Sequence, residues 1–499
     1  MPAGAAAWLG SGVPPDAEPG ASERPQDDGL WTMTLAAVRA ADRVTAEHLA
    51  DDGYCSRVEV PEVGRYDSGW PRLSRSFGVP DKGPPQRSSL FGTTQSILRP
   101  FAYDDVPELV GLIQYVGQRP DLRARLTSDC VGERQDWLID FEAAQLPLTL
   151  LDRMYAVGAH DDVALLALYR ERETAWLSDR LPVERVFPLA LTALDLDEAL
   201  VIDDRTRIEP LDDGTHAARA PRSTGGLDAV PAPVIDAATH AIIITDEIEN
   251  PGPGGRIFGT GRQLDLRVDQ AELICQALRV LTAQGLGFAQ LLLRPLGWAD
   301  SWTHNLPAME VHGTVRRYPD WFDNYGWLRP PDPLPRDLVG RLPAVVSGLS
   351  TSDGNVQLAA RRLSQARLRN DEDDRIIDAC IGLEALLSKD RDELSHRLSL
   401  RAAAALSSHP TEPWRASVVY AAMKRIYEHR STVVHGGSVK PAKRTFSVGS
   451  LSLPNGPLAC RLLGQLLLDV LERPGGWTPD SLDAVILARL DTPPPDAGA

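Results

Sequence analysis

The chain has 499 residues, more than a single hydrophobic core usually serves, so we expect two or three domains. Apolar residues make up 43% of the sequence, and no uninterrupted apolar stretch is long enough to span a membrane. The net charge of −17 argues against a nucleic-acid partner for the surface as a whole. The five cysteines are odd in number and far apart, which argues against a disulfide framework or a zinc knuckle. We therefore expect a cytoplasmic protein with no membrane contact and no metal site.

The N-terminal part divides into a leader and a helical region. Residues 1–28 are rich in Pro, Gly, Ala and Asp and lack the features of a signal peptide, so a disordered leader is expected. Residues 29–183 form a mainly helical region in which apolar residues recur at helical spacing. Pro147 is expected to break or kink one of its helices. The expected helices are 104–118, 136–158 and 163–177.

The pattern changes near residue 184, and 184–334 is predicted to be a mixed α/β region. The segment 240–249 carries three consecutive isoleucines and predicts a buried strand. An amphipathic helix is expected over 269–285, followed by two more strands, 288–298 and 309–318.

Two features of this region could bind a ligand. The Gly-rich segment 252–261 follows a strand, but it lacks the lysine and hydroxyl of a P-loop, so a plain loop is favoured over a phosphate cradle. Seven aromatic residues crowd into the stretch 298–327 beside two arginines, and they could stack bases or form a core. A core or interface is favoured. These aromatics are Trp298, Trp302, Tyr318, Trp321, Phe322, Tyr325 and Trp327.

After a Pro-rich linker at 330–335, the pattern is helical almost throughout, and 335–495 is predicted to be an all-α domain. Residues 355–446 carry 16 Lys and Arg against 11 Asp and Glu, so this part is mildly basic on an acidic chain. RNA contact by this part and a solvated surface of mixed charge remain equally open. The expected helices are 336–348, 355–369, 372–388, 391–407, 413–435, 457–472 and 479–490.

An Arg-x4-His spacing occurs at three places, and context distinguishes them. The first lies in a polar stretch near the leader, and the second begins a helix, where the dipole disfavours a charged imidazole. The third closes the long helix 413–435, which Gly436 and Gly437 terminate. The free carbonyl groups at that end attract a cation, and Ile426, Tyr427 and Val434 are expected to form a buried stripe beside the motif. The three pairs are Arg43/His48, Arg391/His396 and Arg430/His435.

Four stretches of the C-terminal region occur in a specific order. They are AARRLSQAR (359–367), DRIIDACIGLEALLS (374–388), ELSHRLSLRAAAAL (393–406) and KRIYEHRSTVVHGG (424–437). Over about residues 354–437 this order resembles the HEPN superfamily, and particularly its ApeA-like branch. The resemblance covers less than a quarter of the chain. It implies that the C-terminal region is a HEPN-like helical bundle. Together with the mixed region before it, the fold class expected is multi-domain α+β.

The resemblance also implies a chemistry. Many HEPN domains are metal-independent endoribonucleases that act as homodimers, with Arg-x4-His motifs facing each other across a shared cleft. Arg430 would then bind the scissile phosphate of RNA, and His435 would act as general base or acid. The products would carry a 2′,3′-cyclic phosphate and a 5′-hydroxyl, and no metal or cofactor would be needed.

Four further residues are expected to support this pair. The family most often has Asn, Asp or His directly after the motif arginine, where this chain has Ser431. His429 and Glu384 could substitute for that group, and Tyr427 belongs to the matching Tyr-x-x-Arg pattern. For Glu384, a buried carboxylate paired with an arginine of a neighbouring helix is favoured over direct catalysis.

The function implied is an RNA-cleaving effector whose N-terminal region senses a trigger or regulates the C-terminal domain, in antiviral defence or, as a toxin, in growth arrest. The alternative is a catalytically silent HEPN module that binds RNA, a nucleotide or a protein partner. A basic, solvent-reached cleft holding Arg430 and His435 would favour the enzyme. A packed, dry Arg430 paired with Glu384 would favour the silent module.

Overall fold

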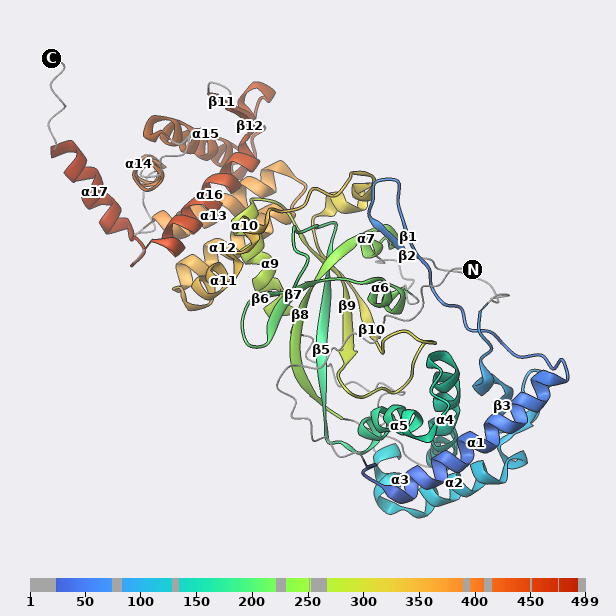
Figure 1. Cartoon of the computed structure of the whole chain (residues 1–499). Coiled ribbons are helices and arrows are strands. Elements are labelled where there is room, and N and C mark those ends of the chain that lie inside the picture. Colours follow the sequence, from blue (N-terminus) through green and yellow to red (C-terminus); the bar gives the residue numbers. More distant parts are fainter. Residues whose placement is uncertain are drawn as a thin grey trace.

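The computed structural model is a mixed α+β protein, as the sequence predicts (Figure 1). The predicted leader and the Gly-rich segment lie mostly outside the described residues. Among the helices described, none is both long and apolar enough to cross a membrane. The structure describes residues 24–73, 83–127, 134–220, 230–250, 252, 267–388, 395–407, 415–448, 451–473 and 475–491.

Five helices pack together at the N-terminal end of the molecule, where Figure 1 draws them in blue to teal. Their shared core includes Leu109, Leu112 and Val116, whose spacing places them on one face of a helix. Helix α4 continues through Pro147 with buried leucines on both sides, so this proline does not end the helix. The five are α1 (Asp28–Ala50), α2 (Pro107–Gln118), α3 (Pro120–Thr127), α4 (Arg134–Val157) and α5 (Asp162–Leu177).

Short elements connect this group of helices to the rest of the chain. They are β1 (Val63–Arg65), β2 (Pro71–Leu73), η1 (Arg87–Leu90), β3 (Phe91–Gly92), β4 (Phe101–Ala102) and η2 (Tyr103–Asp105).

A six-stranded antiparallel sheet occupies the centre, in the order β10-β9-β5-β8-β7-β6 (Figure 1). The predicted strand at 240–249 is confirmed as β8, and its isoleucines lie alternately on the two faces. The strands are β5 (Arg180–Ala190), β6 (Leu200–Val201), β7 (Thr206–Pro210), β8 (Ala238–Glu249), β9 (Gly287–Pro295) and β10 (Glu310–Arg317). The helices within this region are α6 (Asp213–Arg219), α7 (Ala232–Asp236), α9 (Val268–Thr282), η3 (Asp320–Asp323) and η4 (Gly326–Leu328).

The helices of the C-terminal part gather at the opposite side of the sheet from α1–α5 (Figure 1). The prediction of helices almost throughout omits a β-hairpin, β11 and β12, which precedes α16. The elements are α10 (Arg336–Val339), α11 (Leu342–Thr351), α12 (Gly354–Leu368), α13 (Glu372–Leu387), α14 (Ser395–Leu406), α15 (Ala416–Val434), η5 (Pro441–Lys443), β11 (Thr445–Val448), β12 (Leu451–Pro454), α16 (Asn455–Glu472) and α17 (Pro479–Asp491).

One hydrophobic core joins the sheet to these helices. Phe187 and Phe288 on one face of the sheet belong to the same cluster as Ile274 of α9 and Leu463 of α16. Helix α9 contacts α11, α12 and α16, so it lies between the sheet and the C-terminal helices. The domain boundary predicted near residue 335 therefore crosses a continuous apolar core. The division of the chain at residues 28, 183 and 334 stays a prediction.

Candidate functional site

Helix α15 carries the predicted motif and ends as the sequence indicates. Val419, Ala422, Met423 and Ile426 are buried at helical spacing, so this face packs into the core. His435 is the C-cap residue, and its backbone N–H donates to the carbonyl oxygen of Ser431, while the N–H of Gly436 donates to that of Val433. The predicted stop after His435 is thus confirmed.

Gly436 and Val434 complete the description of this helix end. Gly436 follows with a φ of +74°, a left-handed conformation that glycine adopts without strain. The prediction for Val434 is wrong, because its side chain is 49% exposed and does not join the buried stripe.

A cavity of about 920 Å³ lies along the polar side of α15. Four cationic side chains line it against two carboxylates, so its wall is basic. The cations Lys424 and Arg425 come from the same helix as Arg430, whereas Lys443 comes from η5. The full lining is Glu384, Ser388, Ser395, Leu398, Lys424, Arg425, Tyr427, Glu428, His429, Arg430, Ser431, Thr432, Val439 and Lys443.

Arg430 reaches this cavity from α15 and faces Glu384 of α13. The Nη2 atom of Arg430 lies 3.8 Å from Oε1 of Glu384, and both side chains are 35% exposed. That separation is too long for a hydrogen bond. Burial raises the pKa of Glu384, while the nearby Arg430 guanidinium lowers it. The predicted pairing is therefore present as a loose, solvent-reached contact. The Arg430 Nε atom is buried, and no described residue accepts a hydrogen bond from it.

Tyr427 lies beside this pair, and its phenol is more deeply buried than the side chains of Arg430 and Glu384. Its hydroxyl has no hydrogen-bond partner among the residues that the structure describes, and burial raises its pKa well above the usual value. Cys380, which is also buried, and Glu384 add to that shift, whereas Arg430 opposes it. Tyr427 therefore remains a neutral phenol, with an O–H that is free to donate to a ligand.

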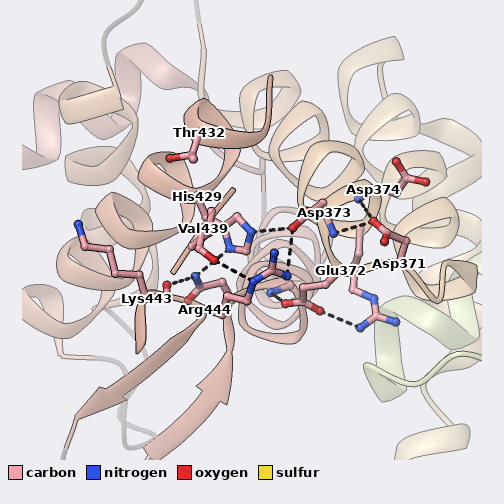
Figure 2. Close-up of polar contacts among 12 residues, drawn as sticks. Asp371, Glu372, Asp373, Asp374, His429, Thr432, Val439, Lys443 and Arg444 are labelled. Atoms are coloured by element: carbon pink, nitrogen blue, oxygen red, sulfur yellow. Dashed lines mark hydrogen bonds and ion pairs between the residues drawn. The ribbon is translucent and has the colours of Figure 1, made fainter. Parts of the chain in front are cut away.

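His429 lines the cavity, and its imidazole is buried in a hydrogen-bond network. Its Nε2 atom lies 2.9 Å from Oδ1 of Asp373 at the start of α13, as Figure 2 shows. The Asn455 Nδ2 atom donates both to His429 Nδ1, at 3.0 Å, and to the carbonyl oxygen of Lys443, at 2.8 Å. His429 Nδ1 is therefore an acceptor, and Nε2 carries the hydrogen that Asp373 accepts.

Ion pairs extend this network to the hairpin (Figure 2). Arg444 Nη1 lies 3.5 Å from Asp373 Oδ1, and its Nε atom donates to the carbonyl oxygen of Val439. Glu372 accepts a hydrogen bond from the backbone N–H of Gly456 at the start of α16. The network thus holds α13, α15, α16 and the residues before the hairpin around the cavity wall.

Replacing His429 with alanine is expected to lower the free energy of unfolding by about 2 to 3 kcal/mol, because Asp373 loses a partner and Asn455 keeps one unpaired N–H. Glu428→Ala is the matched control, since Glu428 is the exposed neighbour and should change stability by less than about 0.5 kcal/mol. Urea unfolding followed by circular dichroism measures both. Equal stability of the His429 variant and the wild type would contradict this role.

His435 is exposed and does not line the cavity of its own chain. Ser431, the residue after Arg430, does line it. The structure therefore brings Glu384, Tyr427, His429, Arg430 and Ser431 together and places His435 just beyond them. Lys424, Arg425 and Glu428 also line the cavity. Lys424 and Arg425 lie four and three residues before Glu428, so the helical spacing in the sequence could have placed them on one polar face of α15.

The other sequence candidates lie elsewhere. Arg43 is paired with Glu108 at 3.6 Å, and His48 Nε2 lies 3.1 Å from the carbonyl oxygen of Tyr54. Arg391 lies outside the described residues, whereas His396 contacts Tyr420 of α15.

The aromatic stretch divides between the interior and the surface. Trp298, Tyr318 and Phe322 are buried, as expected of a core, while Tyr325 is exposed.

Within the described ranges, no three His, Cys, Asp or Glu side chains are grouped closely enough to hold a metal ion. Comparison with protein-family models, curated proteins and solved structures finds no match to this chain.

Proposed function

We propose that this chain is a metal-independent endoribonuclease of the HEPN type, with Arg430 and His435 as its catalytic pair. The observation that carries the proposal is the basic cavity along α15, in which Arg430 is not hydrogen-bonded to Glu384. Its guanidinium is partly exposed, so a phosphate can displace the weak contact with the carboxylate.

The wall of the cavity has the chemistry that RNA requires. Lys424, Arg425 and Lys443 supply positive charge for neighbouring phosphates. Ser431 and Thr432 offer hydroxyl groups, which bind phosphate and sugar oxygens. This local excess of cations supports an RNA partner although the whole chain is acidic.

The proposed reaction is an internal transesterification. His435 removes the proton from the 2′-hydroxyl, whose oxygen attacks the adjacent phosphorus, and the bond from phosphorus to the 5′-oxygen breaks. The leaving oxygen takes up a proton, which a second histidine donates. Arg430 stabilises the charge that develops on the phosphate oxygens. The products are a 2′,3′-cyclic phosphate and a 5′-hydroxyl.

A second copy of the chain would supply that second histidine. His435 lies outside the cavity of its own chain, and the neighbouring Val434 exposes an apolar side chain at the same helix end. Both features support a homodimer in which two ends of α15 face one shared cleft. The N-terminal helices would then sense a trigger or restrain the enzyme, which we place in the cytoplasm in a defence or growth-arrest role.

A silent RNA-binding module is the second candidate, and one observation favours it. His435 does not line the cavity, so a single chain holds the phosphate-binding groups without the motif histidine beside them. Such a module would bind RNA at the same wall and leave it intact.

Incubation with total cellular RNA in EDTA tests the enzyme. We expect cleavage to continue after chelation of divalent ions, because no step uses a metal, and the fragments should carry cyclic-phosphate ends. Electrophoresis shows the fragments, and their resistance to direct ligation at the 3′ end shows the cyclic phosphate. Loss of cleavage in EDTA, with recovery when Mg²⁺ is restored, would contradict the proposed chemistry.

A further inference from the structure

A histidine and a tyrosine form an ordered pair beside residues that line the cavity. His396, near the start of α14, places Nδ1 2.7 Å from the hydroxyl of Tyr420 on α15. The two rings also meet edge to face, with centroids 5.6 Å apart and an interplanar angle of 85°. The imidazole is exposed, yet both contacts fix its orientation.

Neighbouring residues connect this pair to the cavity. The Nζ atom of Lys424 lies over the Tyr420 ring, 5.9 Å from its centroid, and the same lysine lines the cavity. Ser395 and Leu398, which flank His396 on α14, also line the cavity. The pair therefore lies next to cavity-lining residues of α14 and α15.

The distance along α15 separates this pair from the cleavage site. Tyr420 and Arg430 are ten residues apart, which corresponds to about 15 Å along a helix. Stacked bases rise only about 3.4 Å for each nucleotide, so the separation spans several nucleotides of one strand. A ring held beside Tyr420 therefore lies about that far along α15 from the phosphate that Arg430 would bind.

We propose that the His396 imidazole, held by Tyr420, is a base-stacking subsite for single-stranded RNA several nucleotides from the scissile phosphate. A base can stack on an exposed aromatic ring, and an ordered ring loses little entropy when it binds. Lys424 and Arg425 lie between the two ends and bind the intervening phosphates. The proposal rests on the proposed function for the position of the cleaved bond, but it concerns binding.

Length-dependent binding tests the subsite. A fluorescently labelled RNA hexanucleotide and a dinucleotide are titrated into the full chain carrying His435→Ala, which prevents cleavage. His396→Ala in this background is expected to weaken hexanucleotide binding by about tenfold and to leave dinucleotide binding unchanged. His396→Phe, which keeps a ring for stacking, should retain most of the affinity.

Removal of a base checks the same contact from the RNA side. Hexanucleotides that each lack the base at one position are tested in turn. On the protein that keeps His396, one of these RNAs should bind as weakly as the complete hexanucleotide binds to the His396→Ala variant. On the His396→Ala variant, the same RNA should bind no more weakly than the complete hexanucleotide. Unchanged thermal unfolding shows that each variant is folded. The subsite would be overturned if His396→Ala weakened the binding of both RNA lengths equally or of neither. It would also be overturned if every abasic RNA bound the His396→Ala variant more weakly than the complete RNA does.

The outcomes separate this proposal from the proposed enzyme. If the wild type cleaves no RNA, but His396→Ala weakens binding of the hexanucleotide and not of the dinucleotide, the result would support the subsite and contradict the nuclease. Cleavage by a wild type whose RNA affinity ignores His396 would do the reverse.

Discussion

Replacement of His435 with alanine is expected to lower the rate of RNA cleavage by about a hundredfold to ten-thousandfold, the usual contribution of a positioned acid or base. The side chain is exposed at the end of α15, so its loss should leave the fold and the RNA affinity unchanged. Gel-based cleavage of total RNA measures the rate, and thermal unfolding verifies the fold.

His160→Ala is the matched control for this variant. His160 is also exposed, but it lies between α4 and α5, in the N-terminal group of helices. Its replacement should leave cleavage unchanged. Equal cleavage by the wild type and the His435 variant would show that the histidine of this motif takes no part in the reaction.

Arg401 of α14 is expected to contribute strongly to the stability of the C-terminal part. Its side chain is 1% exposed, and both Nε and Nη2 lie 2.8 Å from the carboxylate of Asp483 on α17. Nη1 donates to the carbonyl oxygen of Leu387 at the end of α13. One buried guanidinium thus connects three helices of the C-terminal part.

Arg401→Ala is expected to lower the free energy of unfolding by about 3 kcal/mol, because it leaves a cavity and removes the partner of a buried carbonyl. Arg401→Lys should cost less, since it keeps the charge but loses the two-point contact with Asp483. Arg336→Ala is the control, because Arg336 is exposed. Urea unfolding compares the three, and an Arg401→Ala variant as stable as the control would contradict the assigned role.

The sequence predicts the regular elements well where apolar spacing is strong. The three isoleucines of β8 and the apolar spacing of α9, α13 and α16 are local signals that survive in the structure. The hairpin of β11 and β12 was not predicted, because its strands have four residues each and alternate too briefly to show a period.

The candidate site divides in the same way. Glu384, Tyr427, Arg430 and Ser431 were expected together only because the order of four C-terminal stretches resembles a known family, and they all line the cavity. Lys443, by contrast, reaches the cavity through η5, so no local spacing relates it to α15.

The partners of His429 and the position of His435 were also beyond the sequence. Asp373 and Asn455 begin two other helices, and only packing brings them to the His429 ring. The place of His435 outside the cavity depends on where the helix ends relative to the neighbouring side chains.

Cleavage of a chimeric oligonucleotide tests the central claim most directly. One cleavage site is first mapped in an RNA oligonucleotide, and the nucleotide on its 5′ side is then replaced by its 2′-deoxy counterpart. We predict that cleavage at that bond disappears while binding is retained, because the attacking oxygen is missing and the phosphates are unchanged. Continued cleavage at that bond would show that another nucleophile attacks the phosphate, and it would contradict the reaction assigned to Arg430 and His435.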